Sequence, residues 1–303
     1  MQRLGILAAF VVLLAAAFHS TAQQTAGGRV RELAPSVFYW QGDRERQVQT
    51  NVGWVVFHDY VFVIDANFPW GAREILAEIR KTTSKPVRFV FDTHYHADHA
   101  YGNIVFSEAG AVVVCSRDCA EESRAKGPRD VQNQAKDRST DPLAHPSVLF
   151  EEKLVFDDGE RRVELIKMGP AHTKGDAVAY LPTEKILFVG DLAVNWTLGN
   201  NVSDADADHH NWVRALDRLA GWDAKIVAPG HGVLGTLETI RGQRDYLADM
   251  LRQVEAGIRA GKTAEQLAQE INLTNYQPFG AEPRRTAGQV RSMYRRLAAG
   301  RVR

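Results

Sequence analysis

The sequence predicts a protein of the α/β class, in which strands and helices alternate around one hydrophobic core. Short apolar runs bounded by turn residues recur along the chain, and such runs are typical of buried strands. Segments with apolar residues at helical spacing separate many of them. No linker or internal repeat divides residues 23–303, so we expect a single domain with helices at its C-terminal end.

The first half of the chain is predicted to open with strands and to continue as alternating strands and helices. Three β-runs between residues 28 and 65 are joined by tight turns, which indicates adjacent hairpin strands. Apolar residues at helical spacing predict a helix over 70–82, which ends before Pro86. The elements expected next are a strand over 86–91, a helix over 100–108, a strand over 111–115 and a helix over 118–126.

Residues 127–147 are polar and have no sustained periodicity, so a long loop or irregular excursion near the functional residues is expected there. His145, within this segment, is predicted to be a surface residue rather than a ligand. A strand is expected over 148–156, followed by a hairpin turn at Asp158-Gly159. The remaining predicted elements are strands over 162–168, 177–181, 186–189 and 225–228, helices over 206–221 and 237–259, and two helices within 263–303.

The composition is that of an ordinary folded protein without a strong charge bias. Hydrophobic residues make up 45% of the 303 residues, and charged residues make up 24%. Lysine and arginine together balance aspartate and glutamate at 37 each. Because there is no basic excess, the sequence indicates no nucleic-acid partner. We expect a small-molecule substrate, and the sequence leaves the oligomeric state open.

Residues 1–22 are predicted to form a secretory signal peptide. Arg3 precedes an uncharged, mostly apolar run over 4–18, and the small residues Ser20 and Ala22 precede the expected cleavage position. The alternative is an uncleaved membrane anchor, although a membrane span needs about 20 residues. We therefore expect a periplasmic or secreted protein with no stable membrane span after processing.

The two cysteines, Cys115 and Cys119, are predicted to be reduced and half-buried thiols. An exported protein meets oxidising conditions, so a disulfide between them is the alternative. In a regular helix, however, residues four apart lie near the upper limit of the distance that a disulfide bridges. Neither cysteine has a histidine beside it in the sequence. No catalytic role is assigned to them.

The densest group of functional residues follows the predicted strand over 86–91. His94, His96, Asp98 and His99 fall within six residues, a density that packing does not require and that metal binding does. Side chains two residues apart at a strand end share a face, so His94 and His96 can converge on one ion. If the chain then turns into a helix, Asp98 and His99 can bind a second ion. The sequence therefore predicts a metal site.

Three later motifs follow this group in order along the chain. They are Gly-Pro-Ala-His-Thr at 169–173, Gly-Asp at 190–191 and Pro-Gly-His-Gly at 229–232. Together the four motifs resemble the metallo-β-lactamase superfamily, and the resemblance extends over about 37–247. It implies a four-layer αβ/βα sandwich, in which two mixed β-sheets lie face to face with helices outside. It also implies a dinuclear zinc site at one edge of the sheets.

The resemblance also implies the ligands of two Zn²⁺ ions per chain. These are His94, His96 and His172 for the first ion, Asp98, His99 and His231 for the second, and Asp191 as the carboxylate that bridges both. Zinc lowers the pKa of a bound water to about 7, and Asp98 can orient the resulting hydroxide as a catalytic residue. The alternatives are a turn aspartate at 191 and isolated loop histidines at 172 and 231. Asp65 is either an acceptor for a ligand imidazole or a structural turn residue.

The position within the superfamily is indicated by two substitutions. The run over 172–206 is similar to lactamases that use a cysteine ligand, but Asp191 stands at the cysteine position. Val194 stands at the position of the lysine that binds the substrate carboxylate, and Lys174 or an arginine from 127–147 could replace its charge. Asp191 and Pro-Gly-His-Gly resemble instead the hydrolase branch that includes glyoxalase-type thioesterases. Ala97 occupies the position of a glutamate in redox members, which argues against a di-iron oxygen-reducing enzyme.

These observations lead to three functional hypotheses. The first is an exported dinuclear zinc hydrolase, in which metal-bound hydroxide attacks an ester, thioester, lactone or amide carbonyl. Asn200 or Asn201 could donate a hydrogen bond to the developing oxyanion, or could serve as a turn residue. The second hypothesis is a β-lactamase. The third is a non-catalytic periplasmic metal-binding accessory protein.

Overall fold

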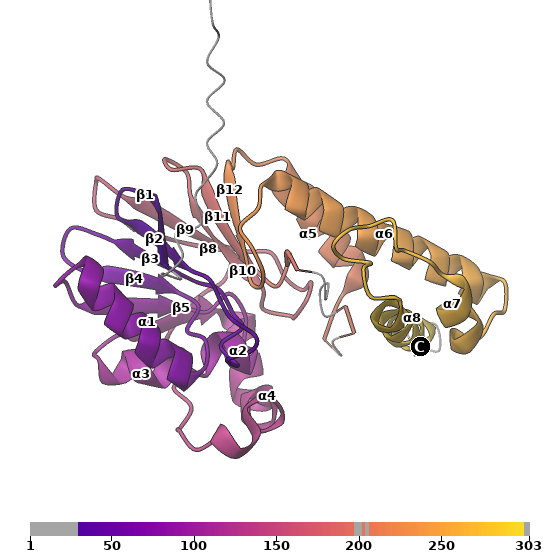
Figure 1. The fold of residues 1–303 in the computed structure, drawn as a ribbon, viewed down its shortest axis with the longest axis horizontal. Coiled ribbons are helices and arrows are strands. Elements are labelled where there is room, and N and C mark those ends of the chain that lie inside the picture. The colour runs from indigo at the N-terminus through magenta and orange to yellow at the C-terminus, as the bar shows by residue number, and fades with distance from the viewer. Residues whose placement is uncertain (1–29, 197–201, 204–205, 300–303) are drawn as a thin grey trace, which may run out of the picture.

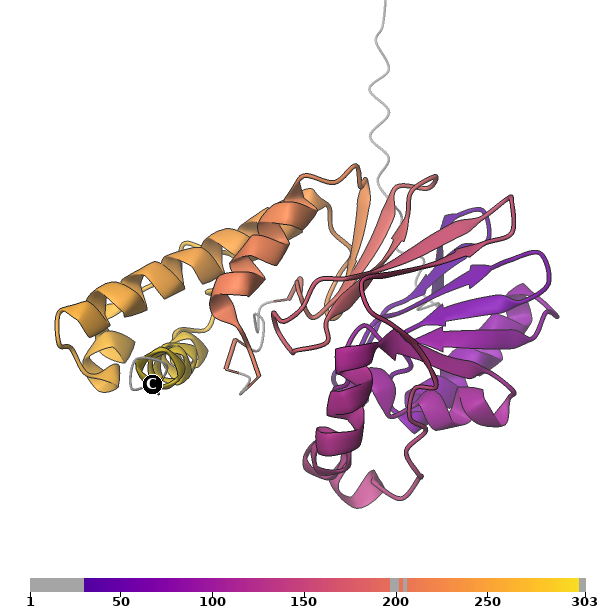
Figure 2. The same ribbon diagram turned by 180° about the vertical axis from the view of Figure 1, so that it is seen from behind.

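A computed structural model describes residues 30–196, 202–203 and 206–299. It consists of two mixed β-sheets that face one another, with helices against their outer surfaces (Figure 1, Figure 2). The predicted αβ/βα sandwich is confirmed. The predicted signal peptide lies outside the described residues. Within the described ranges, no helix combines the length and the apolar character needed to span a membrane.

The first sheet has seven strands, and its parallel half carries the first of the four motifs. The strands, in spatial order, are β1 (Val30–Ala34), β2 (Val37–Trp40), β3 (Val52–Val56), β4 (Val61–Ile64), β5 (Val87–Phe91), β6 (Val112–Ser116) and β7 (Val148–Phe150). Strands β1 to β4 pair antiparallel, whereas β4 to β7 pair parallel. Parallel strands end at the same edge of a sheet. Asp65 and the loop after Phe91 therefore emerge side by side.

The second sheet has five strands in the order β12-β11-β10-β9-β8. They are β8 (Lys153–Asp157), β9 (Arg162–Lys167), β10 (Ala177–Leu181), β11 (Ile186–Gly190) and β12 (Ile226–Pro229). Strands β11 and β12 are parallel to each other. Strand β10 is antiparallel to both β11 and β9, so β9 runs in the same direction as β11 and β12. The carboxyl ends of these three strands thus share one edge. This edge carries His172, Asp191 and His231.

The helices fall into two groups, one beside each sheet. Beside the first sheet lie α1 (Pro69–Thr82), α2 (Ala97–Ala100), α3 (Asn103–Glu108) and α4 (Arg117–Ala135). The second group contains α5 (His209–Ala220), α6 (Leu237–Arg259), α7 (Ala264–Glu270) and α8 (Pro283–Ala299). Helix α6 has the bounds expected from the sequence. Figures 1 and 2 show that α6, α7 and α8 extend away from the sandwich.

The core between the sheets joins apolar side chains from both of them. Phe62 and Phe91 of the first sheet pack in one cluster with Leu165 and Phe188 of the second. The Phe62 ring also lies 4.7 Å from the ring of Phe156, centroid to centroid. Burial of each large apolar side chain contributes about 1.5–3 kcal/mol, so this layer is a major source of the sandwich's stability. It holds the two ligand-bearing edges at a fixed separation.

The prediction of a loop throughout 127–147 is wrong for its first part. Helix α4 continues through Pro128 to Ala135, and a short 3-10 helix follows over Lys136–Arg138. The sequence Gly-Pro suggests a helix end, but tertiary packing outweighs this local preference. Val131 and Ala135 are buried against the side chains of Phe68, Ala97 and Tyr101. The second half of α4 thereby covers the segment that carries the metal-binding motif.

Three further expectations need correction. The single strand predicted over 148–156 is two strands, β7 and β8, which belong to different sheets. The helix predicted over 100–108 is divided into α2 and α3, because the chain turns at Tyr101-Gly102. Cys115 and Cys119 are free thiols, as expected, but they are fully buried rather than half-buried. Burial raises the pKa of the Cys115 thiol.

Candidate metal centre

The loop after β5 presents its polar residues to the interior rather than to solvent. His94 and His99 are fully buried, and His96 and Asp98 are nearly so. The carbonyl of His96 accepts hydrogen bonds from the backbone N–H groups of His99 and Ala100, each at 2.9 Å, and this starts α2. This turn sets Asp98 and His99 on a helix while His94 and His96 stay on the extended segment. The pair His94 and His96 and the pair Asp98 and His99 can therefore point toward two different metal positions.

One group of ligand atoms comes from His94, His96 and His172. The Nε2 of His94 lies 3.1 Å from the Nδ1 of His96, and the Nε2 of His172 lies 3.2 Å from the same atom. Two nitrogen ligands of a tetrahedral zinc, each about 2.0–2.1 Å from the ion, are about 3.3 Å apart. The spacing of these nitrogens therefore fits a single zinc ion.

A second group comes from Asp98, His99 and His231. The Nε2 of His231 lies 3.3 Å from the Nε2 of His99 and 3.3 Å from the Oδ2 of Asp98. The three ligand atoms lie within 4.8 Å of one another and the three residues are buried. Two imidazoles and a carboxylate are a donor set that zinc accepts. The second group also fits one ion.

Asp191 lies between the two groups. Its Oδ1 is 3.2 Å from the Nε2 of His231 and 3.4 Å from the Nε2 of His99. Its Oδ2 points the other way and lies 3.8 Å from the Nε2 of His172. One carboxylate oxygen thus faces each group, which is the placement of a bridging ligand. The structure brings all seven sequence-predicted ligands together.

Two glycines make room for the bridging carboxylate. Gly190 has a φ of +51°, and a Cβ on it would lie 2.4 Å from the Oγ1 of Thr93. A Cβ on Gly230 would lie 2.1 Å from the Oδ1 of Asp191. Any larger residue at either position would force side chains apart. The Gly-Asp and Pro-Gly-His-Gly motifs therefore have a steric reason for their glycines.

Asp65 connects the ligands of both groups. Its Oδ2 lies 3.0 Å from the Nδ1 of His99, and its Oδ1 accepts hydrogen bonds from the N–H and the Oγ1 of Thr93 at 2.9 and 3.0 Å. The same Thr93 hydroxyl lies 3.1 Å from the Nδ1 of His94. Of the two roles considered for Asp65, the geometry shows the acceptor role. A hydrogen bond to the far ring nitrogen fixes the orientation of a ligand imidazole.

Burial and mutual charge give the centre strongly shifted pKa values. Burial, with the positive charges of neighbouring imidazoles, holds the pKa of His94 well below its usual range, so its ring is neutral and able to bind metal. Burial alone would lower the pKa of His99, but the carboxylates of Asp65, Asp191 and Asp98 hold this pKa well above its usual range. Burial opposes ionisation of Asp191, but His231 and His99 hold its pKa well below the usual range. Charge is therefore concentrated and compensated within the centre.

Several residues that support the centre were not predicted from the sequence. The Nε2 of Gln49 and the Oγ1 of Thr50 donate to the Oδ2 of Asp98 at 3.1 and 3.2 Å. The Oδ2 of Asp130 accepts from the N–H of Ala97 at 2.7 Å and holds the start of α2. The ring of Trp196 stacks on that of His231, with centroids 4.6 Å apart. These contacts join distant segments, and no local pattern in the sequence indicates them.

Four other residues were considered from the sequence as possible substrate-binding positions. Asn200 and Asn201 fall outside the described residues. Val194 is only 1% exposed, so a lysine at this position would be buried. Lys174 is engaged with carboxylates, at 2.6 Å from the Oδ1 of Asp118 and 3.2 Å from Glu121. It therefore does not replace the missing lysine.

Arg138 and His145, both from 127–147, are engaged with other residues. The guanidinium of Arg138 lies over the ring of Trp70, 3.4 Å from its centroid. His145 is exposed, as predicted, and lies 3.0 Å from the hydroxyl of Ser123. It belongs to none of the candidate metal-binding groups found among the described residues.

Two facing sheets with a three-imidazole group, a mixed group and a shared carboxylate at one edge define an αβ/βα protein with a candidate metal centre. The chain belongs to the metallo-beta-lactamase superfamily, whose family model matches residues 46–231. This stretch includes all seven candidate ligands. The family resemblance predicted from the sequence is confirmed.

Curated relatives carry two different activities in their names. The chain is 24% identical over 252 residues to a linear primary-alkylsulfatase from Pseudomonas sp. (strain ATCC 19151), a match that covers 69% of this chain and 48% of that protein. It is 26% identical over 165 residues to a metallo-beta-lactamase type 2 from Bacillus sp. (strain 170), with 54% and 58% covered. The chain thus spans about half the length of these relatives.

Solved structures show the same fold. A metallo-beta-lactamase from Pontibacter korlensis superposes with a TM-score of 0.62 at 24% identity, covering 73% of this chain and 98% of that one. The sec-alkylsulfatase Pisa1 from Pseudomonas sp. superposes with a TM-score of 0.70 at 17% identity. That likeness covers 89% of this chain and 50% of the sulfatase chain.

Proposed function

We propose that the protein is an exported dinuclear zinc hydrolase that cleaves an ester-type bond. The observation that carries this proposal is the division of seven ligand atoms into two groups that share Asp191. The donor set of imidazoles and carboxylates suits zinc, and a fixed pair of ions is a common device of hydrolases. Membership of a superfamily with named lactamase and sulfatase relatives supports the same reaction type.

The residues have separate tasks in such a reaction. Bound zinc would supply a water of lowered pKa and would polarise the bond to be cleaved. Asp98 is held in one orientation by Gln49 and Thr50, so its carboxylate is placed to accept a proton from an attacking water. Burial raises the pKa of Asp98, but His99 and His231 lower it below the ordinary value. Asp98 is therefore ionised and able to act as the acceptor.

The substrate classes follow from this chemistry and from the relatives. Carbonyl esters, thioesters, lactones and amides are the first candidates, because each undergoes attack by water at a polarised carbonyl. Sulfate esters are a second candidate, favoured by the fold likeness to a sec-alkylsulfatase, which covers 89% of this chain. β-Lactams are a weaker candidate, because the position of the lysine that binds the substrate carboxylate in the similar lactamases is occupied here by the buried, uncharged Val194.

The test is a substrate panel on the purified, zinc-loaded protein, with metal content measured on the same sample. The panel contains 4-nitrophenyl butyrate, a thioester, a γ-lactone, hexyl sulfate and a cephalosporin. We expect close to two zinc ions per chain and turnover of at least one ester-type substrate, abolished in Asp98→Ala. Two bound ions without any turnover would favour the accessory-protein alternative. Metal content near zero after loading would refute the metal centre itself.

Export is a separate part of the proposal and rests on the apolar run at the N-terminus. The apolar segment over 4–18 and the small residues before position 23 support cleavage after Ala22. Intact-mass analysis of the protein from a secreting host should therefore give a chain that begins at or near Gln23. Retention of Met1 in the secreted or periplasmic fraction would contradict it.

A further inference from the structure

Most cations near the metal centre are already paired with carboxylates. Arg46 lies 2.5 Å from Glu74, and Lys126 lies 3.0 Å from Glu122 and 2.5 Å from Asp206. A substrate that used either cation would have to displace these carboxylates. A cation without a carboxylate partner would bind a substrate anion without this cost.

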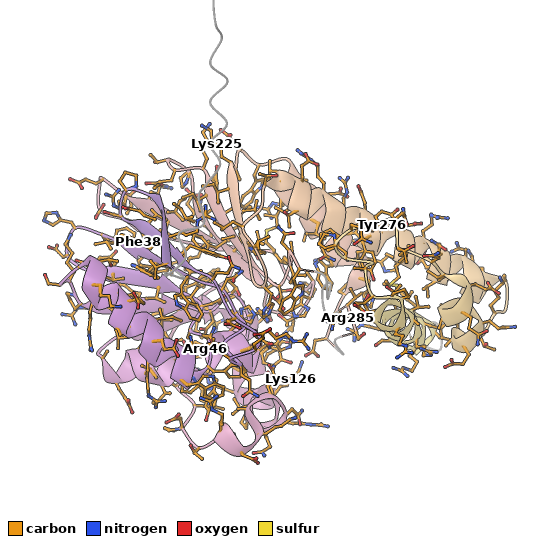
Figure 3. All side chains as sticks on the ribbon, in the orientation of Figure 1. Phe38, Arg46, Lys126, Lys225, Tyr276 and Arg285 are labelled. Carbon is orange, nitrogen blue, oxygen red and sulfur yellow. The ribbon has the colours of Figure 1, made fainter. Side chains whose placement is uncertain are left out.

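Arg285 meets this description. It lies in the first turn of α8, and Figure 3 shows it on the side of that helix toward the sandwich. The side chain is partly buried, and its Nε is wholly buried without a hydrogen-bond partner. Among the ion pairs of the described residues, none involves Arg285. A buried, uncompensated guanidinium nitrogen is costly, so a partner is expected from outside the chain.

The charge of the metal centre acts on Arg285. Burial lowers its pKa, and the nearby positive charge of Arg44 acts in the same direction, whereas Tyr246 and Asp191 act in the opposite direction. Arg285 is therefore within electrostatic reach of the bridging carboxylate Asp191 on one side and of Arg44, in the 41–51 loop, on the other. A guanidinium stays charged despite such a shift. Two arginines from distant segments thus lie close enough for their charges to interact.

The surroundings of Arg285 increase the energetic cost of its positive charge when no anion is bound. Its position in the first helical turn adds the positive end of the helix dipole, and that turn has no acidic residue. One turn before Tyr246 on α6, Gln243 is fully buried, and neither of its amide atoms has a hydrogen-bond partner. The junction of α6 and α8 therefore contains polar atoms of Gln243 and Arg285 that have no hydrogen-bond partner among the described residues.

We propose that Arg285, with Arg44 nearby, binds an anionic group of the substrate, so that the hydrolase selects carboxylate- or sulfate-bearing substrates. The inference rests on the proposed function, because it assigns a substrate class to that site. Two bound divalent ions would carry more positive charge than Asp98 and Asp191 neutralise, so an occupied centre would also favour an anion. A guanidinium pairs two of its N–H groups with two oxygens of a carboxylate or a sulfate.

Carboxylate and sulfate are the two forms of this anion, and matched substrates separate them. Mono-4-nitrophenyl glutarate carries a carboxylate remote from its ester, and 4-nitrophenyl pentanoate is a neutral ester of the same acyl length. Hexyl sulfate carries its negative charge on the reacting group itself. The measured quantity is the ratio of kcat/KM for the glutarate ester to kcat/KM for the pentanoate ester, with hexyl sulfate turnover measured in parallel.

Arg285→Met should lower this ratio by about 10-fold or more, because a charge-assisted hydrogen bond is lost. Arg285→Lys keeps the charge without the paired N–H groups, so it should give an intermediate ratio. Arg284→Met is the matched control, since Arg284 is an exposed arginine in the same turn. An unchanged ratio together with unchanged hexyl sulfate turnover in Arg285→Met, or an equal fall in Arg284→Met, would overturn the proposal. If Arg285→Met loses turnover of hexyl sulfate alone, the anion that Arg285 and Arg44 bind is the sulfate ester.

Direct binding separates this inference from the proposed hydrolase activity. Calorimetric titration of the zinc-loaded protein with glutarate and with sodium sulfate should show weaker binding of at least one anion to Arg285→Met than to wild type. If the wild-type protein cleaves no ester but binds an anion through Arg285, the hydrolase proposal fails and the anion site stands. If both esters are cleaved and Arg285→Met changes neither binding nor the ratio, the hydrolase stands and the anion site fails.

Discussion

Replacement of Asp65 by asparagine should weaken metal binding although Asp65 is not itself a ligand. The carboxylate faces three donors at once, which are the Nδ1 of His99 and the N–H and hydroxyl of Thr93. Asparagine has a similar shape and tolerates the positive φ of 61° found here, but it offers only one acceptor oxygen. Either His99 or Thr93 must then face an NH₂ group.

The size of the effect follows from two contributions. Loss of the residue that orients a ligand imidazole costs about 10–100-fold in metal affinity, which corresponds to about 1.4–2.7 kcal/mol. A buried donor left without an acceptor costs a further ~1–3 kcal/mol in the free energy of unfolding of the metal-free protein. Because Asp65 bonds His99 directly, the ion held by Asp98, His99 and His231 should be lost first.

The assay is zinc content after equilibration with graded concentrations of a chelator, with urea unfolding of the metal-free protein as a separate measurement. Thr93→Val provides the matched comparison, because it leaves Asp65 free to bond His99 but removes the hydroxyl beside His94. We expect this variant to affect the first ion more than the second. An Asp65→Asn protein that keeps both ions with wild-type affinity would refute the reasoning.

Three further predictions follow from the same contacts. Asp191→Asn should reduce zinc content from two ions toward one, because Asp191 faces both ligand groups, whereas two tightly held ions and full activity would remove it from the centre. Burial raises the pKa of Asp176 from its ordinary 3.8 to about 8, so the folded state holds a proton that the unfolded chain has lost. The free energy of unfolding of the metal-free protein should fall as pH rises through that window, by up to ~1.4 kcal/mol per unit, and Asp176→Asn should remove this dependence in pH-dependent urea unfolding. Gln243→Met should raise the thermal midpoint, since it removes two unsatisfied buried polar atoms at ~1–3 kcal/mol each, and an unchanged or lower midpoint in calorimetry would contradict this.

The order of strands and helices was largely predictable from the sequence, because apolar periodicity is a local signal. Residues 237–259 illustrate this, since the predicted bounds of the helix are those of α6. Where the prediction was wrong, a distant contact outweighed the local pattern. Helix α4 passes through Pro128 because Val131 and Ala135 bury themselves against another segment. The break between Phe150 and Lys153 reflects a change of sheet, which periodicity does not indicate.

The ligands were recognisable because their spacing is a local pattern, whereas the residues that orient them were mostly not. Gln49 and Thr50 lie almost fifty positions from the Asp98 that they contact, and nothing in their neighbourhood distinguishes them from other polar loop residues. Asp65 was an exception, since its place at a strand end suggested an acceptor. The charge expected to replace the missing lysine was sought in Lys174 and 127–147. In the structure Lys174 is ion-paired, and Arg138 from that segment stacks on a tryptophan.

Arg285 explains why motif-based reasoning identifies the metal centre more readily than the substrate. The family match ends at residue 231, and Arg285 lies more than fifty positions beyond it, on a helix that the shared motifs do not include. Helix α8 packs on α6 through the hydroxyl of Tyr246 beside Thr286 and Gln289, and in this position Arg285 is influenced by the charge of Asp191. Metal ligands must lie within a few ångströms of an ion, which fixes their positions. A residue that binds an anion at the edge of the centre can belong to any neighbouring helix or loop. Substrate preference can therefore change through the C-terminal helices while the ligand motifs stay the same.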